Sequence, residues 1–101
     1  MLDMLRYHLF DGAHVWKDEF GTVDDPQDFA ALAKYSPYHK VRDGVAYPAT
    51  MIVSGGADRN CNPLHARKMT ARLQAANISK RPIFLDYHEF RGRSRPLPFR
   101  L

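Results

Sequence analysis

The stretch "ATMIVSGGADRNCNPLHARKMTARLQAAN", residues 49–77, decides the fold. It begins with a short apolar run closed by two glycines, residues 49–56, which is typical of a strand buried on both faces of a parallel sheet. A polar loop follows, Pro63 marks the first turn of a helix, and Asn77 is expected to end that helix in the left-handed conformation. Four apolar residues of the helix recur at spacings of three, four and three and are expected to face the sheet: Ala66, Met69, Leu73 and Ala76.

A second strand is expected at "PIFLDYHEF", residues 82–90. The two strands and the helix between them form one right-handed βαβ unit, so the predicted fold class is α/β. Two parallel strands with apolar faces need further strands and helices to cover them. We therefore expect residues 1–101 to be part of a larger domain, with a helical and loop segment over residues 1–47 and a βαβ segment with a basic tail over residues 48–101.

The first segment carries the signals of short helices. Residues 1–9 show a weak helical stripe of apolar residues. A clearer helix begins after Asp25, the expected N-cap, because Pro26 suits the first helical position. Ser36 precedes Pro37 and is expected to end this helix. Three of its apolar residues are expected to lie on the buried side: Phe29, Leu32 and Ala33.

The composition fits one globular domain. The chain has 101 residues, of which 45% are hydrophobic and 26% charged, so disorder is not expected. No apolar run is long enough to span a membrane, and the opening residues lack the pattern of a signal peptide. Cys61 is the only cysteine, which excludes an internal disulfide. The five histidines lack metal-ligand spacing, so neither a metal site nor a cofactor is expected.

The net charge of +4 resides in the C-terminal part of the chain. Residues 80–101 hold six basic and two acidic residues, whereas basic and acidic residues balance over residues 1–79. A basic tail attracts phosphates, but such a run is more often a solvated surface, so nucleic-acid binding is not the favoured interpretation. The alternative function is a non-catalytic remnant that binds a protein or a nucleic acid through this tail.

Several motifs carry a resemblance to a known family: "DMLRYH" at residues 3–8, "YSPYH" at 35–39, "YPAT" at 47–50 and "PLH" at 63–65. On these motifs the chain resembles the C-terminal part of the catalytic domain of the prolyl oligopeptidase family of serine peptidases. The resemblance implies a partial α/β-hydrolase fold, cut at both ends. It also implies a peptide substrate, and a partner in the missing N-terminal part of the catalytic domain. The compartment stays open between cytoplasm and periplasm.

The family acts by acyl transfer with a Ser-His-Asp triad. Counting back without gaps from Pro63 places the family's aspartate on Asp58, in the loop after the first strand. From the sequence alone, an aspartate in such a glycine-flanked loop is more often a cap or a turn former, whereas the resemblance favours the triad position. None of the four serines lies in a Gly-x-Ser-x-Gly elbow. The chain is therefore expected to supply the triad acid without the nucleophile and to be inactive alone.

Two further positions depart from the family pattern. Arg93 stands where the resemblance expects the histidine, and arginine stays protonated, so it cannot serve as a general base. His88 is the nearest substitute, although its position favours an ordinary strand histidine. The same ungapped count places Asn60 where the family commonly has an arginine that reaches the substrate backbone. Asn60 is therefore the candidate substrate-binding residue, and the prolyl preference stays open.

Overall fold

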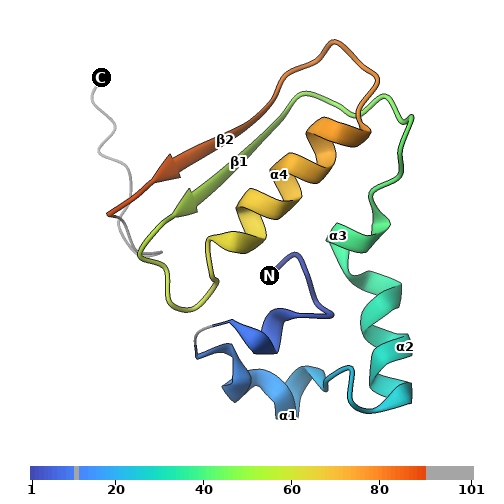
Figure 1. Ribbon diagram of the computed structural model, residues 1–101, viewed down its shortest axis with the longest axis vertical. Coiled ribbons are helices and arrows are strands. Elements are labelled where there is room, and N and C mark those ends of the chain that lie inside the picture. The colour runs from blue at the N-terminus through green and yellow to red at the C-terminus, as the bar shows by residue number, and fades with distance from the viewer. Residues whose placement is uncertain (11, 91–101) are drawn as a thin grey trace.

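The computed structural model describes residues 1–10 and 12–90 of the chain (Figure 1). A two-stranded sheet and its helix form one part of the molecule, and a set of short helices forms the other. In chain order the elements are the 3-10 helices η1 (Tyr7–Leu9) and η2 (Ala13–Trp16), the helices α1 (Lys17–Phe20), α2 (Pro26–Tyr35) and α3 (Pro37–Lys40), the strand β1 (Thr50–Gly55), the helix α4 (Leu64–Ala76) and the strand β2 (Ile83–His88). None of the described helices is long and apolar enough to cross a bilayer.

The sheet confirms the predicted strand, helix and strand. β1 and β2 pair in parallel, from Thr50 opposite Ile83 to Gly55 opposite His88. In Figure 1, α4 runs along both strands and lies between them and the N-terminal segment. The carboxyl ends of both strands therefore meet at one edge, next to the loop that connects β1 to α4.

The face of α4 that packs on the sheet is the predicted one. Ala66, Leu73 and Ala76 are buried, and Met69 is partly buried. Leu73, Ala76 and Met69 belong to an apolar cluster that also contains the buried residues Val41 and Ile83 and the partly buried Tyr47 and Ile52. The cluster thus combines residues from both sides of the 47/48 boundary, because the chain before β1 packs against α4 and β2.

The opposite face of the sheet is open, so the predicted burial of β1 on both faces is wrong for the described residues. Met51 is 62% exposed and Val53 is 53% exposed. Phe84, the register partner of Met51, is 53% exposed. Successive side chains of a strand point to opposite faces, and α4 covers only the face that carries Ile52 and Ile83.

The N-terminal residues form 3-10 turns where a helical stripe was expected. Met4 and Tyr7 are buried, whereas Leu9 is 67% exposed. The carboxylate of Asp3 accepts a hydrogen bond from the Arg6 backbone amide at 3.2 Å. This side-chain bond supports a turn at residues 3–6 in place of a regular helix. Met4 and Tyr7 join Ala13 and Leu32 in a second apolar cluster, which the partly buried Met1, Leu5 and Phe20 extend.

The boundaries of α2 are as predicted, and its buried side is narrower than predicted. Asp25 caps the helix by accepting hydrogen bonds from the Gln27 and Asp28 amides at 2.8 and 3.1 Å. Ser36 caps its end before Pro37. Leu32 is buried at 1% exposure, but Phe29 is 46% exposed.

Asn77 does not adopt the left-handed conformation that was expected. Its backbone is extended, with φ −73° and ψ 130°. Its amide oxygen accepts hydrogen bonds from the backbone amides of Tyr47 and Ser79 at 3.0 and 2.9 Å. Asn77 therefore joins the end of α4 to two loops through its side chain.

We predict that substitutions at two positions of α2 differ sharply in their effect. Leu32→Ala removes a fully buried side chain and should lower the free energy of unfolding by about 2–5 kcal/mol. Phe29→Ala should lower it by about 1 kcal/mol, because nearly half of that side chain is already in water. Urea unfolding followed by circular dichroism measures both. Equal losses would contradict the described packing of α2.

Candidate functional site

Asp58 lies in the loop that follows the carboxyl end of β1. Its backbone amide donates to the carbonyl of Gly55 at 3.2 Å. One carboxylate oxygen, Oδ1, accepts hydrogen bonds from the backbone amides of Asn60 at 2.9 Å and Cys61 at 3.0 Å. This pattern is that of an Asx turn, so Asp58 shapes its own loop as its sequence context indicated.

The second carboxylate oxygen of Asp58 has no protein partner within the described residues. Both hydrogen bonds that reach the carboxylate go to Oδ1, and no basic side chain forms an ion pair with it. The backbone amides thus fix the position of the carboxylate and leave Oδ2 able to accept a further hydrogen bond. A triad acid requires this arrangement, because it must be held in place while it binds a histidine.

Asp58 lines an open cavity of about 730 Å³, whose other lining residues come from the N-terminal segment, from β1 and from the loop after β1. Trp16 at the end of η2 and Phe20 at the end of α1 supply aromatic rings, with centroids 6.4 Å apart. The remaining lining residues are Met1, Glu19, Val53, Asn60 and Cys61. The cavity therefore combines a carboxylate, an amide and a thiol with an aromatic and aliphatic wall.

The sequence interpretation did not include Trp16 and Phe20 in the site. A signal was present, because Trp16 is the only tryptophan and Phe20 follows it four residues later, within the charged stretch "WKDEF". Residues at this spacing share one side of a helical turn. The sequence does not reveal that this side faces a loop some forty residues further along the chain.

Asn60 lies beside Asp58 and lines two cavities. It borders the cavity of Asp58 and a second open cavity of about 620 Å³. Trp16 also borders both cavities, so the two cavities adjoin at these two residues. The other residues of the second cavity are Gly12, Val15 and Arg59. The predicted candidates Asp58 and Asn60 thus lie together at one end of the sheet.

His88 pairs with its own strand. Its Nε2 atom lies 3.2 Å from Oδ1 of Asp86, and its backbone carbonyl accepts a hydrogen bond from Gly56 at 2.9 Å. Within the described residues, no hydrogen bond or ion pair joins the ring of His88 to Asp58. Arg93, the other residue considered for the histidine position, lies outside the described residues.

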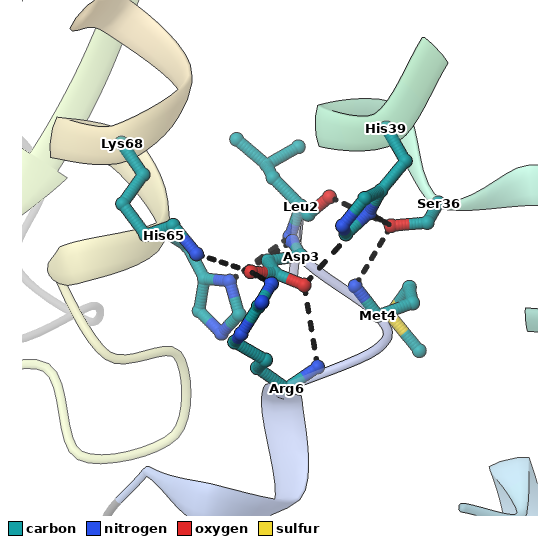
Figure 2. A network of polar contacts seen from close by, with 8 residues as sticks. All are labelled: Leu2, Asp3, Met4, Arg6, Ser36, His39, His65 and Lys68. Atoms are coloured by element: carbon teal, nitrogen blue, oxygen red, sulfur yellow. Dashed lines mark hydrogen bonds and ion pairs between the residues drawn. The ribbon is translucent and has the colours of Figure 1, made fainter. Parts of the chain in front are cut away.

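A buried polar network joins the N-terminal segment to α4 and α3 (Figure 2). The carboxylate of Asp3 is fully buried, and it binds the Lys68 ammonium and the Arg6 guanidinium. The ring of His39 lies 3.9 Å from it. Burial alone would raise the pKa of Asp3, but the hydrogen bond and charge of Lys68, followed by the charges of His39 and Arg6, lower it below its ordinary value.

His65, the first buried residue of α4, binds the same segment. Its Nδ1 atom accepts hydrogen bonds from the backbone amides of Asp3 at 3.1 Å and Leu2 at 3.4 Å. Burial, with the nearby charges of the amino terminus and Lys68, lowers the pKa of His65 to about 4, although Asp3 opposes this shift. The ring is therefore neutral at pH 7, with its proton on Nε2.

Ser36, His39 and Asp3 have the composition of a triad without its geometry. The Ser36 hydroxyl lies 2.8 Å from Nδ1 of His39, and the Asp3 carboxylate lies 3.9 Å from the same nitrogen. A catalytic histidine uses its two nitrogens for the two partners. Ser36 is also fully buried and accepts a hydrogen bond from the Met4 amide at 3.0 Å. These three residues support the fold.

Across the described parts of the chain, no three His, Cys, Asp or Glu side chains are grouped so that they could hold a metal ion. The site around Asp58 thus offers a carboxylate, backbone amides and aromatic rings as its functional groups. This set is suited to orienting a protonated base and an apolar ligand.

Comparisons with known proteins agree on one protein family. The profile of the prolyl oligopeptidase family matches residues 1–89. A prolyl endopeptidase of Elizabethkingia miricola is 38% identical over 86 residues, which are 84% of this chain and 12% of the relative. A prolyl endopeptidase of Dictyostelium discoideum is 39% identical over 75 residues, which are 73% of this chain and 10% of the relative.

Solved structures share the fold as well as the sequence. A structure from a study of two prolyl endopeptidases superposes with a TM-score of 0.82 at 40% identity, covering 90% of this chain and 13% of that one. Prolyl oligopeptidase B of Galerina marginata, bound to a 35mer hydrolysis and macrocyclization substrate, gives a TM-score of 0.80 at 30% identity over 87% of this chain and 13% of its own. The chain spans only about an eighth of these relatives.

We predict that His65 makes stability depend on pH between about 4 and 6.5. Its pKa of about 4 lies below the ordinary value of 6.5, so the unfolded chain binds more protons in this range. The free energy of unfolding should fall as the pH is lowered from 7 to 4, by about 3 kcal/mol.

The variant His65→Asn should flatten this dependence above pH 4.5. Asparagine can still accept hydrogen bonds from the two backbone amides, but it has no proton to gain. His14→Asn is the control, because His14 is exposed and belongs to η2, outside the elements that carry the network. Urea unfolding at a series of pH values measures the slope. An unchanged slope in His65→Asn would contradict the assignment.

Proposed function

Because this chain belongs to the prolyl oligopeptidase family and has part of its α/β-hydrolase fold, we propose that it forms part of a serine peptidase active site. Asp58 is the triad acid in this proposal, and peptide bonds are hydrolysed by acyl transfer. The nucleophilic serine comes from the remainder of a catalytic domain, since no serine of this chain lies in a Gly-x-Ser-x-Gly elbow.

The observation that carries the proposal is the asymmetric bonding of the Asp58 carboxylate. Backbone amides of Asn60 and Cys61 hold Oδ1, while Oδ2 has no partner among the described residues. Oδ2 is then the atom that accepts the Nδ1 proton of the catalytic histidine. That bond fixes the tautomer in which Nε2 faces the serine, and it stabilises the imidazolium when Nε2 takes the serine proton.

The chemical steps follow from these roles. The serine oxygen attacks the peptide carbonyl as its proton passes to the histidine, and the histidine returns that proton to the leaving amine. An acyl-enzyme remains, and water cleaves it by the same proton transfers in reverse order. Asp58 exchanges no proton in these steps and contributes by orienting the histidine.

The aromatic wall of the cavity serves as the pocket for one substrate side chain. Trp16 and Phe20 present rings next to Asp58, and Val53 adds an aliphatic surface. A pocket with an apolar wall and few polar groups suits a compact apolar residue such as proline. The names of the relatives, which are prolyl peptidases, agree with this choice of substrate.

Asn60 contacts the backbone of the substrate in this proposal. Its amide can both donate and accept a hydrogen bond, and it lies at the edge of the pocket beside Trp16. The segment before residue 48 thus supplies the aromatic wall, and the segment from residue 48 supplies the acid and the amide. This division of roles follows the two segments that the sequence indicated.

We predict that Asp58→Asn abolishes most of the peptidase activity. The asparagine amide can present an N–H where the histidine needs an acceptor, so kcat should fall by about 10³–10⁴-fold. The protein is used in the longest form that its source contains, with a chromogenic prolyl peptide as substrate. Asp43→Asn, an exposed acid far from the cavity, is the control and should keep full activity.

The parent protein for this comparison depends on the residue at position 93. Wild type and Arg93→His are assayed first, and Asp58→Asn is introduced into the more active of the two. The 101-residue chain alone serves as the negative control, because it has no nucleophile elbow. Undiminished hydrolysis by Asp58→Asn, or serine-dependent turnover by the 101-residue chain, would contradict the proposal.

A further inference from the structure

The second cavity next to Asp58 has a different chemical character from the first. Among the described residues that line it, Arg59 alone is charged, whereas the first cavity is lined by the carboxylates Asp58 and Glu19. Trp16 and Asn60 border both cavities. A ligand that occupies both cavities therefore contacts an acidic and apolar lining in the first and a cationic lining in the second.

The Arg59 guanidinium is available for a ligand. Arg59 is exposed, and no described residue forms an ion pair or a side-chain hydrogen bond with it. Arg6 and Arg72, in contrast, bind Asp3 and Asp43. The adjacent Asp58 carboxylate binds two backbone amides through Oδ1 and forms no ion pair with Arg59 in the described geometry.

We infer that the cavity of Arg59 binds a carboxylate group of the peptide whose apolar residue occupies the pocket of Trp16 and Phe20. This inference rests on the proposed function for the first cavity, and it adds a specificity-determining residue, Arg59, to that site. The carboxylate is either an acidic side chain or the free carboxyl terminus of the peptide, because both present the same group.

The lining of the cavity fits this ligand. A guanidinium binds a carboxylate through two parallel hydrogen bonds, which a neutral amide cannot reproduce. Val15 and the Trp16 ring lie beside Arg59 and offer apolar contact to the methylene groups of an acidic side chain. Glu19 in the first cavity repels a carboxylate. The charge of the ligand therefore also determines which part of it enters which cavity.

The spacing between the apolar residue and the carboxylate is short. An extended peptide advances about 3.3–3.6 Å per residue, and the two cavities share Trp16 and Asn60 as lining residues. A carboxylate one or two residues away from the apolar residue is therefore within reach.

Trp16 provides the measurement, because it is the only tryptophan and lines both cavities. The fluorescence of the 101-residue chain is titrated with four short peptides that share one proline. The first is blocked at both ends and neutral, the second and third carry a glutamate on either side of the proline, and the fourth has a free carboxyl terminus. Circular dichroism first establishes that each protein variant has the helix content of wild type.

We expect one of the acidic peptides to bind about three- to tenfold more tightly than the neutral peptide at low salt. This preference should shrink in 1 M salt, where the Debye length is about 3 Å. Arg59→Gln should abolish the preference and leave the affinity for the neutral peptide unchanged. Arg59→Lys should retain part of it, and Arg81→Gln, at the far end of the sheet, should retain all of it.

The outcomes distinguish a failure of the carboxylate site from a failure of the proposed apolar pocket. Equal affinities for neutral and acidic peptides, or a preference that survives in Arg59→Gln, would overturn the carboxylate site while the apolar pocket stands. Arg59-dependent binding of acidic peptides without binding of the neutral one would support the carboxylate site and contradict the apolar pocket. No binding of any peptide would overturn both. Tighter binding of the glutamate peptides identifies a side chain as the ligand, and tighter binding of the free acid identifies the carboxyl terminus.

Discussion

The ion pair between the buried Asp3 and the partly buried Lys68 is the contact on which the arrangement of the site depends. A fully buried carboxylate is stable only when charges and hydrogen bonds replace the water it has lost, and Lys68, Arg6 and the Arg6 amide do so. Removing one partner of such a pair costs about 3–5 kcal/mol. Lys68 belongs to α4, so this pair fastens the N-terminal segment to the helix that covers the sheet.

The two apolar clusters lie on either side of this polar junction. Phe20 packs against the cluster of Met4 and Tyr7, and the Trp16 ring lies next to Phe20, whereas Asp58 follows β1. The cavity that holds all three residues is therefore assembled from two separately packed units. His65 strengthens the same junction, because it binds two backbone amides of the N-terminal segment while remaining neutral. Site geometry and stability are thus linked through a few buried polar contacts.

The Asp58 carboxylate explains why a single acid occupies this loop. One oxygen folds the loop by binding two backbone amides, and the other is left for a ligand or a catalytic partner. The two interpretations that the sequence permitted, a turn former and a triad acid, are therefore compatible. Backbone amides fix the position of this acid without an ion pair, which is a useful property for orienting a histidine.

Much of the fold could be predicted because it depends on local patterns. The spacing of apolar residues identified the buried face of α4, and the Asp25-Pro26 pair identified the start of α2. The place of Asp58 followed from the end of a strand and a family motif.

Features set by distant contacts could not be predicted. The 3-10 turns of residues 1–9 depend on a carboxylate that binds α4, and Asn77 is extended because its amide binds two loops. The open face of the sheet, with Met51 and Phe84, reflects how many elements surround it, which periodicity does not encode. The aromatic wall was not predicted because the loop of Asp58, which it faces, lies some forty residues further along the chain. The alternative of a binding role for the basic tail stays a prediction, since most of its basic residues lie beyond residue 90.

The most direct test of the central claim is a crystal structure of the protein, in the longest form that its source contains, with a prolyl boronate bound to the reactive serine. We expect the Nδ1 atom of the histidine that contacts this serine to lie about 2.6–3.2 Å from Oδ2 of Asp58. Oδ1 should keep its bonds to Asn60 and Cys61, and the prolyl ring should lie against Trp16. A histidine held by a different acid, with Asp58 facing solvent, would contradict the claim.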